Sequence, residues 1–140
     1  MSGAAEERAF EALEPDSGRA AEVAWLVLRS LLPALAEEDL EEFGAALTQV
    51  QRLVGEGFAA VQGGSFHPRA GELVAALLDL GAAGAGQSSW GPAAFGLAGD
   101  EAHARNLAGA LEARLPGRAS VRVVGFDNDG ARVEGPCVYS

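Results

Sequence analysis

The chain is organised around the run Gly84-Ala85-Gly86-Gln87-Ser88-Ser89-Trp90-Gly91-Pro92. Its glycines lack a Cβ, so a ligand can approach the main chain closely and successive amide groups can point at one anionic group. Gln87, Ser88 and Ser89 add side-chain hydrogen-bond donors without adding charge, and Trp90 places a large aromatic ring beside them. The run therefore predicts a loop that binds a small ligand.

A second interpretation of this run needs no ligand. The glycines can make a tight turn between a helix that ends at Leu80 and a strand that begins at Ala93, with Trp90 packed in the core. For Trp90 alone we favour core packing, and for the whole run we favour ligand binding. Two familiar glycine motifs are excluded. A dinucleotide-binding loop follows a strand and precedes a helix, and a Walker loop needs a lysine, which this chain lacks.

Helices are predicted on the amino-terminal side of the run. A short helix over residues 2–13 precedes a second one over residues 17–35, which carries apolar side chains on nearly every side. Such a helix is typical of a core, and a bend is expected at Pro33. A third helix follows over residues 40–54, where apolar side chains recur every three or four residues, and a fourth over residues 68–80.

Strands and one more helix are predicted on the carboxy-terminal side. Residues 93–98 form a short apolar strand, and residues 100–115 form a helix. Residues 121–126 alternate as a second strand, which turns at 127–130 and pairs back with residues 132–134. This order of elements predicts an α+β fold in which helices pack on one face of an antiparallel sheet.

The length of the chain favours a single domain. With 140 residues, of which 49% are apolar, the chain can bury one core but not two comfortable ones. We expect residues 1–135 to form this domain and residues 136–140 to be a flexible tail.

The charge of the chain excludes two classes of partner. Ten arginines, no lysine and twenty acidic residues give a net charge of −10. This charge repels the phosphates of nucleic acids and of anionic lipid surfaces, so we expect neither a nucleic acid nor a membrane as partner. The apolar run over residues 23–36 is too short to span a bilayer.

The single cysteine, Cys137, allows neither an intramolecular disulfide nor a cysteine metal site. Residues 1–14 are acidic and interrupted by charges, unlike a signal peptide. Both observations favour a reducing cytoplasm as the compartment.

The run from Gly84 to Pro92 resembles the third motif of the GHMP kinase superfamily. The form Gly-Gln-Ser-Ser-Trp-Gly-Pro, here residues 86–92, is similar to that of the beta-ribofuranosylaminobenzene 5′-phosphate synthases and is much more specific than the loose superfamily form. The resemblance covers nearly the whole chain and includes residues 43–51, 67–80 and the segment that ends at Phe126-Asp127.

This resemblance implies a ferredoxin-like carboxy-terminal domain and a cytoplasmic enzyme. Such an enzyme joins 4-aminobenzoate or 4-hydroxybenzoate to phosphoribosyl diphosphate, releases carbon dioxide and diphosphate, and serves the synthesis of tetrahydromethanopterin or a related pterin. Magnesium would accompany the diphosphate. The implied substrate-binding residues are Gly84, Gly86, Gln87, Ser88, Ser89, Trp90 and Gly91. No catalytic base is apparent among them, and no residue of the chain is predicted to bind a metal.

The resemblance also implies that the activity needs a second lobe. Superfamily members carry an amino-terminal lobe with a phosphate-binding loop, for which this sequence offers no equivalent, so the expected partners are such a lobe, or a second copy of the chain, and a small-molecule substrate. Two alternatives stay open: the lobe of an ATP-dependent GHMP small-molecule kinase, and a non-catalytic interaction module or remnant.

Three further positions carry weaker signals. His67 can face a ligand from the preceding loop, although a capping or surface role is more common at a helix start. His103 is expected to face solvent, without metal-ligating neighbours in the sequence. Asp127 and Asp129 are expected to shape a hairpin turn, because the rest of a calcium-binding loop is missing.

Overall fold

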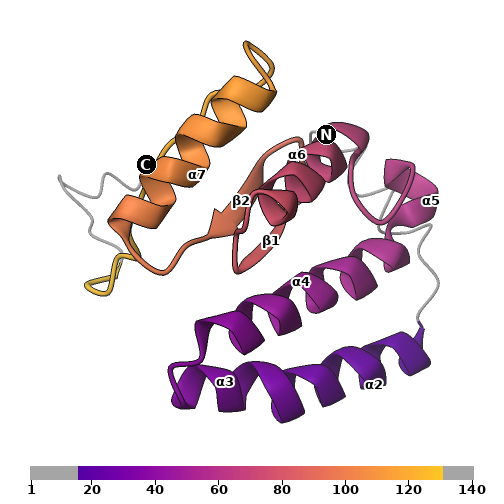
Figure 1. The fold of residues 1–140 in the computed structure, drawn as a ribbon. Coiled ribbons are helices and arrows are strands. Elements are labelled where there is room, and N and C mark those ends of the chain that lie inside the picture. The colour runs from indigo at the N-terminus through magenta and orange to yellow at the C-terminus, as the bar shows by residue number, and fades with distance from the viewer. Residues whose placement is uncertain (1–15, 131–140) are drawn as a thin grey trace, which may run out of the picture.

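The computed structural model describes residues 16–130 as helices packed with a two-stranded antiparallel sheet (Figure 1). This arrangement confirms the predicted α+β class. The elements are, in chain order, α2 (Ser17–Leu26), η1 (Val27–Leu31), α3 (Leu32–Ala36), α4 (Leu40–Gly57), α5 (Ala59–Gln62), α6 (Pro68–Asp79), β1 (Gly84–Gln87), β2 (Ala94–Leu97) and α7 (Glu101–Arg114). None of the helices among residues 16–130 combines the length and the apolar character needed to cross a bilayer.

Three aspartates begin helices where the sequence predicts helix starts. The carboxylates of Asp16, Asp39 and Asp100 each accept a hydrogen bond from the backbone N–H three residues further on, at 2.9, 3.0 and 2.8 Å. These bonds satisfy amide groups that a helix start leaves without a partner. The Arg19 backbone N–H, helped by the guanidinium of the same residue, holds the pKa of the Asp16 carboxyl below its usual value.

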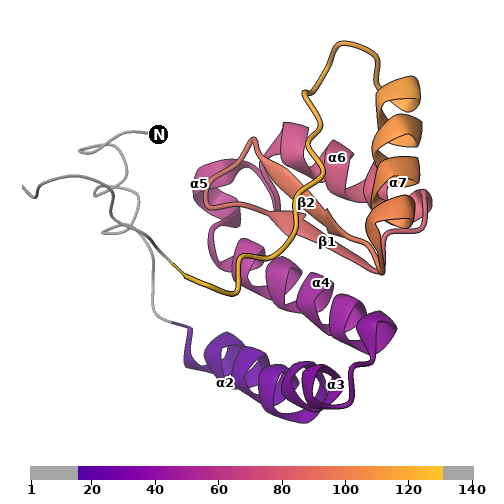
Figure 2. The same cartoon turned by 90° about the vertical axis from the view of Figure 1, so that its left-hand side faces the viewer.

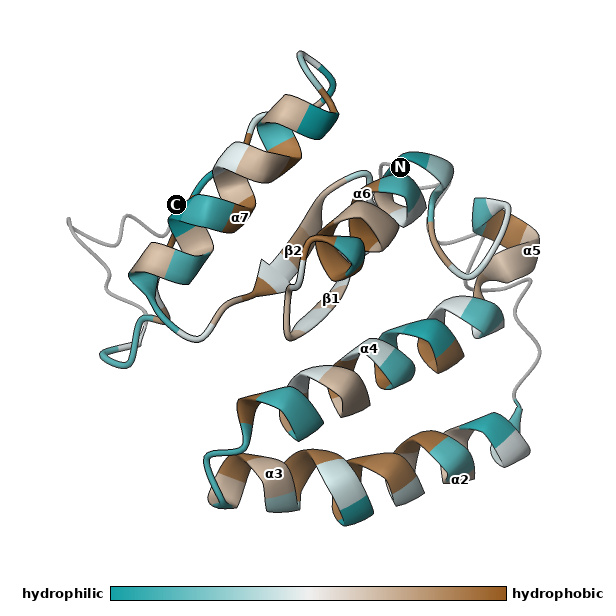
Figure 3. Cartoon of the chain, viewed as in Figure 1, coloured by the Kyte–Doolittle hydropathy of each residue, from teal (hydrophilic) through white to brown (hydrophobic). Residues whose placement is uncertain are grey.

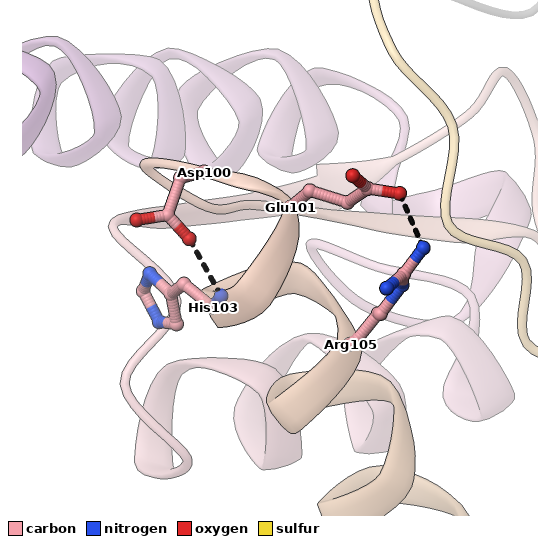
Figure 4. A network of polar contacts seen from close by, with 4 residues as sticks. All are labelled: Asp100, Glu101, His103 and Arg105. Atoms are coloured by element: carbon pink, nitrogen blue, oxygen red, sulfur yellow. Dashed lines mark hydrogen bonds and ion pairs between the residues drawn. The ribbon is translucent and has the colours of Figure 1, made fainter.

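At the start of α7, the cap lies beside an ion pair on the helix surface (Figure 4). Asp100 accepts from the backbone N–H of His103, while Glu101 and Arg105 form an ion pair at 2.6 Å along the helix surface. His103 is half-buried, and its Nδ1 accepts a hydrogen bond from the Gly99 N–H at 3.3 Å. His103 therefore closes the turn before α7.

The elements α2, η1 and α3 form one continuous helical row, which contacts α4 along its length (Figure 2). Where a bend is predicted at Pro33, the structure has the π-helical turn η1, which ends two residues before the proline. Proline lacks an N–H and crowds the carbonyl four residues earlier, and a widened turn relieves both problems. The prediction that this helix lies within a core is wrong for the described residues, since only Ala34 of the row is buried.

The sheet consists of β1 and β2 in antiparallel register, with Gly84 opposite Leu97 and Gln87 opposite Ala94. Helix α6 packs on both strands, and α4 runs beside β1. The core lies between the sheet, α6 and α7. Its buried members are Val74, Ala76, Leu77, Ala82, Ala85, Leu107 and Leu111.

Two predictions about strands need correction. Residues 84–87, expected in a loop, form the strand β1, because their small side chains let α4 and α6 approach closely. Residues 121–126, expected as a strand, have no regular secondary structure and are largely exposed, since no described segment pairs with their backbone. The predicted helix 2–13, the hairpin partner 132–134 and the tail 136–140 lie outside the described residues.

A pair of glycines sets the distance between α4 and β1. A Cβ on Gly44 would lie 2.1 Å from the carbonyl oxygen of Ala83, and a Cβ on Gly84 would lie 2.4 Å from the carbonyl oxygen of Gly44. Neither position has room for a side chain, because the obstructing atoms belong to the backbone. This contact brings the polar side chains of α4 within reach of the edge of β1.

Candidate functional site

A pocket of about 210 Å³ opens where the carboxy-terminal half of α4, α5, the loop before α6 and the end of β1 meet. Its polar lining residues are Gln51, Gln62, Ser65, Gln87 and Ser89. Its remaining lining residues are Val54, Gly55, Phe58, Phe66 and Trp90. The lining thus combines neutral hydrogen-bonding groups with aromatic rings and contains no charged side chain.

Gln87 is the centre of a hydrogen-bond network in the wall of this pocket. Its Oε1 accepts from the His67 backbone N–H at 2.7 Å, and its Nε2 donates to Gln62 Oε1 at 3.1 Å and to the Ser89 carbonyl oxygen at 2.8 Å. The Nε2 of Gln62 donates in turn to the carbonyl oxygens of Gly55 and Ser65. The network therefore ties α4, the loop before α6 and the end of β1 together.

The direction of every bond in this network is fixed by the backbone at its two ends. Carbonyl oxygens can only accept and the His67 N–H can only donate, so the amides of Gln62 and Gln87 each have one possible orientation. Both amide hydrogens of each side chain are used. These two glutamines therefore shape the pocket instead of offering donors to a ligand.

Two other side chains retain donors for a ligand. Gln51 Oε1 accepts from the Gln87 backbone N–H at 3.1 Å, which leaves its Nε2 without a hydrogen bond to any described residue. Ser89 lines the pocket with a hydroxyl that likewise bonds to no described side chain or backbone group, and its backbone lies in the left-handed region at φ +50°. Gln51 and Ser89 are the candidate ligand donors of the site.

The aromatic part of the lining is held in place by ring packing. Phe58 and Trp90 meet edge to face, with ring centroids 5.0 Å apart and an interplanar angle of 76°. Trp90 is half-buried, so it both packs, as we favoured for this residue alone, and lines the pocket. Phe66 closes the wall from the loop before α6.

The predicted substrate-binding residues divide into two groups. Three of them line the pocket: Gln87, Ser89 and Trp90. Four of them are not in its lining: Gly84, Gly86, Ser88 and Gly91. The structure therefore brings the second half of the glycine-rich run, not the first, to the cavity.

The prediction that this run leaves its main chain open to a ligand is wrong for β1. Thr48 Oγ1 accepts a hydrogen bond from the Ala85 N–H at 2.9 Å, and Gln51 Oε1 accepts one from the Gln87 N–H. A Cβ on Gly86 would lie 2.6 Å from Cγ of Gln51 and 2.7 Å from Cζ of Phe95, so this glycine makes room for neighbouring side chains. In β1, therefore, side chains of α4 bind the amides of Ala85 and Gln87.

Six side chains of the lining were not among the predicted substrate-binding residues: Gln51, Val54, Phe58, Gln62, Ser65 and Phe66. No signal in the sequence marks Gln51, because its partner Gln87 lies 36 residues further along the chain. His67 caps α6 as expected of a histidine at a helix start, with Nδ1 accepting from the Arg69 N–H at 3.2 Å.

The acidic pair Asp127 and Asp129, weighed as a calcium site, has a structural role. Asp127 accepts from the Asp129 N–H at 2.9 Å, which is a local turn. Within residues 16–130, no three histidine, cysteine or acidic side chains gather as a metal site.

Comparisons with known proteins show which family the chain resembles. The family model of the GHMP kinases C terminal matches residues 31–117. A beta-ribofuranosylphenol 5′-phosphate synthase of Methanothermobacter thermautotrophicus is 32% identical over 106 residues, which are 76% of this chain and 30% of the relative. A protein of the same name from Archaeoglobus fulgidus is 38% identical over 76 residues, 54% of this chain and 22% of the relative.

No solved structure matches the chain. The chain spans less than a third of the length of these curated relatives. The family model, in contrast, covers more than half of the chain and includes α4, the sheet and α7. The resemblance to the GHMP kinase superfamily is thereby confirmed, and the chain belongs to the family of GHMP kinase carboxy-terminal domains.

Proposed function

We propose that this chain is the carboxy-terminal lobe of a synthase that joins an aromatic acid to phosphoribosyl diphosphate, and that its pocket holds the aromatic acid. The observation that carries the proposal is the lining itself, which sets the neutral donors Gln51 and Ser89 beside the rings of Phe66 and Trp90. The names of the relatives describe a ribofuranosyl 5′-phosphate joined to a phenol, which favours 4-hydroxybenzoate over 4-aminobenzoate.

The size of the pocket supports a substrate with a single ring. Its 210 Å³ lies below the roughly 300–1,000 Å³ that is common for pockets of drug-sized ligands. A benzoate presents two flat faces for aromatic contact and one or two oxygen atoms for hydrogen bonds. The volume and the aromatic lining together suit the single ring of the aromatic acid.

The absence of a cation in the lining suits the proposed chemistry. A bond forms between C1 of the ribose and the ring carbon that carries the carboxylate, and diphosphate leaves C1 with the electrons of its C–O bond. The bond between the ring and the carboxylate carbon then breaks. Carbon dioxide leaves, and the electrons of that bond return to the ring. An arginine or lysine against the carboxylate would stabilise the acid before it reacts. Neutral donors such as Gln51 Nε2 and Ser89 Oγ can orient the ring without that cost.

The complete activity needs more than this chain, because the relatives are more than three times as long as their matched segments. Magnesium would neutralise the diphosphate of the second substrate. The pocket lining offers no carboxylate and therefore does not fit this ion. We place magnesium and the phosphoribosyl diphosphate against the part of the enzyme that this chain does not match.

The experiment that tests the proposal combines the chain with the unmatched portion of the Methanothermobacter relative. The pair should release diphosphate when phosphoribosyl diphosphate and 4-hydroxybenzoate are both present, with carbon dioxide in equal amount. Omitting either substrate is the control. A folded, associated pair that releases neither product, or that instead transfers phosphate from ATP, would refute the synthase and in the second case favour a kinase.

The hydroxyl of Ser89 can be tested as a donor to the aromatic acid. Ser89→Ala should weaken 4-hydroxybenzoate binding about two- to tenfold, because it removes one neutral hydrogen bond. Titration by NMR, followed at the Trp90 indole resonance, measures this change. Ser88→Ala is the matched control, since Ser88 is exposed and does not line the pocket. Equal affinities of the two variants would argue against Ser89 as a donor to the bound acid.

A further inference from the structure

The side chain of Gln51 has a fixed orientation in the wall of the pocket. Its Oε1 accepts a hydrogen bond from the Gln87 backbone N–H at 3.1 Å. A backbone N–H can only donate, so the oxygen of the Gln51 amide is the atom that is turned toward β1. Gln51 also lines the pocket. It therefore presents its donor, Nε2, to a ligand, because its acceptor is engaged by β1.

Two neighbouring residues explain why Gln51 lies so close to β1. A Cβ on Gly86 would come within 2.6 Å of Gln51 Cγ and 2.8 Å of its Cδ, so the glycine leaves the space that this side chain fills. Thr48, three residues earlier on α4, binds the Ala85 N–H in the same way. Hydrophilic and hydrophobic segments alternate along α4 (Figure 3), and these two polar residues fall on the side that contacts β1.

The reaction determines which end of the aromatic acid meets Gln51. The bond to the ribose forms at the ring carbon that carries the carboxylate, so this end must face the second substrate. Ser89 is exposed, whereas Gln51 is half-buried where α4 meets β1. The carboxylate end therefore lies toward Ser89, and the substituent in the para position lies toward Gln51.

We propose that Gln51 selects a hydroxyl over an amino group at the para position of the acid, a role that rests on the proposed function. A phenol oxygen both donates and accepts hydrogen bonds, as that of tyrosine does. The nitrogen of an aromatic amine shares its lone pair with the ring, so it donates but accepts poorly. Gln51 Nε2 can donate to the hydroxyl oxygen. With the amine two donors meet, and a donor left without a partner weakens binding.

The acceptors of the neighbouring hydrogen-bond network are already in use. They are the carbonyl oxygens of Gly55, Ser65 and Ser89 and the side-chain oxygens of Gln62 and Gln87. Each of them accepts a hydrogen bond within the network, so an amine would have to compete with the donor that is present. This wall of the pocket therefore favours a ligand group that accepts.

Exchanging the donor for an acceptor tests the role of Gln51. Gln51→Glu keeps an acceptor for the Gln87 N–H and replaces Nε2 by an oxygen. The probes are 4-aminobenzoate, which only donates at the para position, and 4-methoxybenzoate, which only accepts there. NMR titration at the Trp90 resonance gives both dissociation constants. Relative to the wild-type chain, their ratio should shift by more than about tenfold in favour of the amine.

This comparison of ratios removes two unwanted effects. The added negative charge acts on the carboxylate of both probes alike, and the extra methyl group of 4-methoxybenzoate is the same in both proteins. Gln49→Glu is the matched control, because it adds the same charge to the exposed side of α4 and should leave the ratio unchanged.

A second variant removes the hydrogen bond without adding charge. The wild-type chain should bind 4-hydroxybenzoate about tenfold more tightly than 4-aminobenzoate. Gln51→Met has a side chain of similar length without the amide, so its two dissociation constants should lie within about threefold of each other.

Three results would overturn the role of Gln51. The wild-type chain can bind 4-hydroxybenzoate and 4-aminobenzoate equally, or Gln51→Glu can leave the ratio of the probes unchanged. In the third, Gln51→Glu weakens both probes by one large factor, which would place the carboxylate against Gln51. The acids still bind in all three, so the proposed function would stand. If no benzoate binds, either to the chain alone or with the unmatched portion of the relative, the proposed function fails and the role of Gln51 fails with it.

Discussion

Replacing Gly44 by alanine is expected to prevent stable folding, or to lower the free energy of unfolding by more than about 3 kcal/mol. The added Cβ would lie 2.1 Å from the carbonyl oxygen of Ala83 and 2.8 Å from the amide nitrogen of Gly84. Backbone atoms cannot rotate away as a side chain can, so α4 and β1 would have to separate. That separation would break the hydrogen bond from Ala85 to Thr48 and disturb the pocket beyond it.

Gly109→Ala is the matched control for this change. Gly109 lies within α7, and a Cβ there would meet no atom within 4 Å. Alanine is favoured over glycine inside a helix, so this variant should gain about 0.5–1 kcal/mol. Thermal or urea unfolding followed by circular dichroism measures both changes. A Gly44→Ala chain with wild-type stability would mean that α4 and β1 do not approach as closely as described.

Replacing Gln87 by alanine is expected to cost about 2–4 kcal/mol of folding free energy, because three groups lose their partner at once. These groups are the His67 N–H, Gln62 Oε1 and the Ser89 carbonyl oxygen. Gln87→Glu should be similarly harmful although it has nearly the same shape. A carboxylate can still accept from His67, but it cannot donate to the two oxygens that it then faces.

The same urea titration measures the Gln87 variants, with NMR shifts of Trp90 reporting on the pocket. Gln49→Ala is the control, since Gln49 is exposed on α4 and should change stability by less than about 0.5 kcal/mol. A stable Gln87→Glu chain with an unchanged Trp90 signal would show that the network does not shape the pocket.

The helices could be predicted from the sequence because their signals are local. Asp16, Asp39 and Asp100 mark helix starts by side-chain chemistry, and Pro68 opens α6. The strand β1 could not be predicted in this way. Its sequence, Gly-Ala-Gly-Gln, has low strand propensity, and it becomes a strand through pairing with β2 and close packing against α4.

Only part of the pocket could be predicted, again because the sequence shows local signals and not contacts between distant residues. Ser89 and Trp90 stand out within one short run, whereas Gln51 and Gln62 come from 36 and 25 residues earlier than Gln87 and meet it only in the folded chain. A glutamine on a helix carries no sign of such a partner. The role of the glycines was misjudged because close approach by a helix and close approach by a ligand require the same residue type.

The way in which α4 closes one side of β1 restricts how the sheet can grow. Thr48 and Gln51 accept hydrogen bonds from the amides that a neighbouring strand would otherwise use, and the Gly44 contact leaves no space there for another chain. On the far side of β2, no described segment pairs with the strand. Any third strand, whether from a longer polypeptide or from another molecule, must therefore be added beside Phe95 and its neighbours in β2.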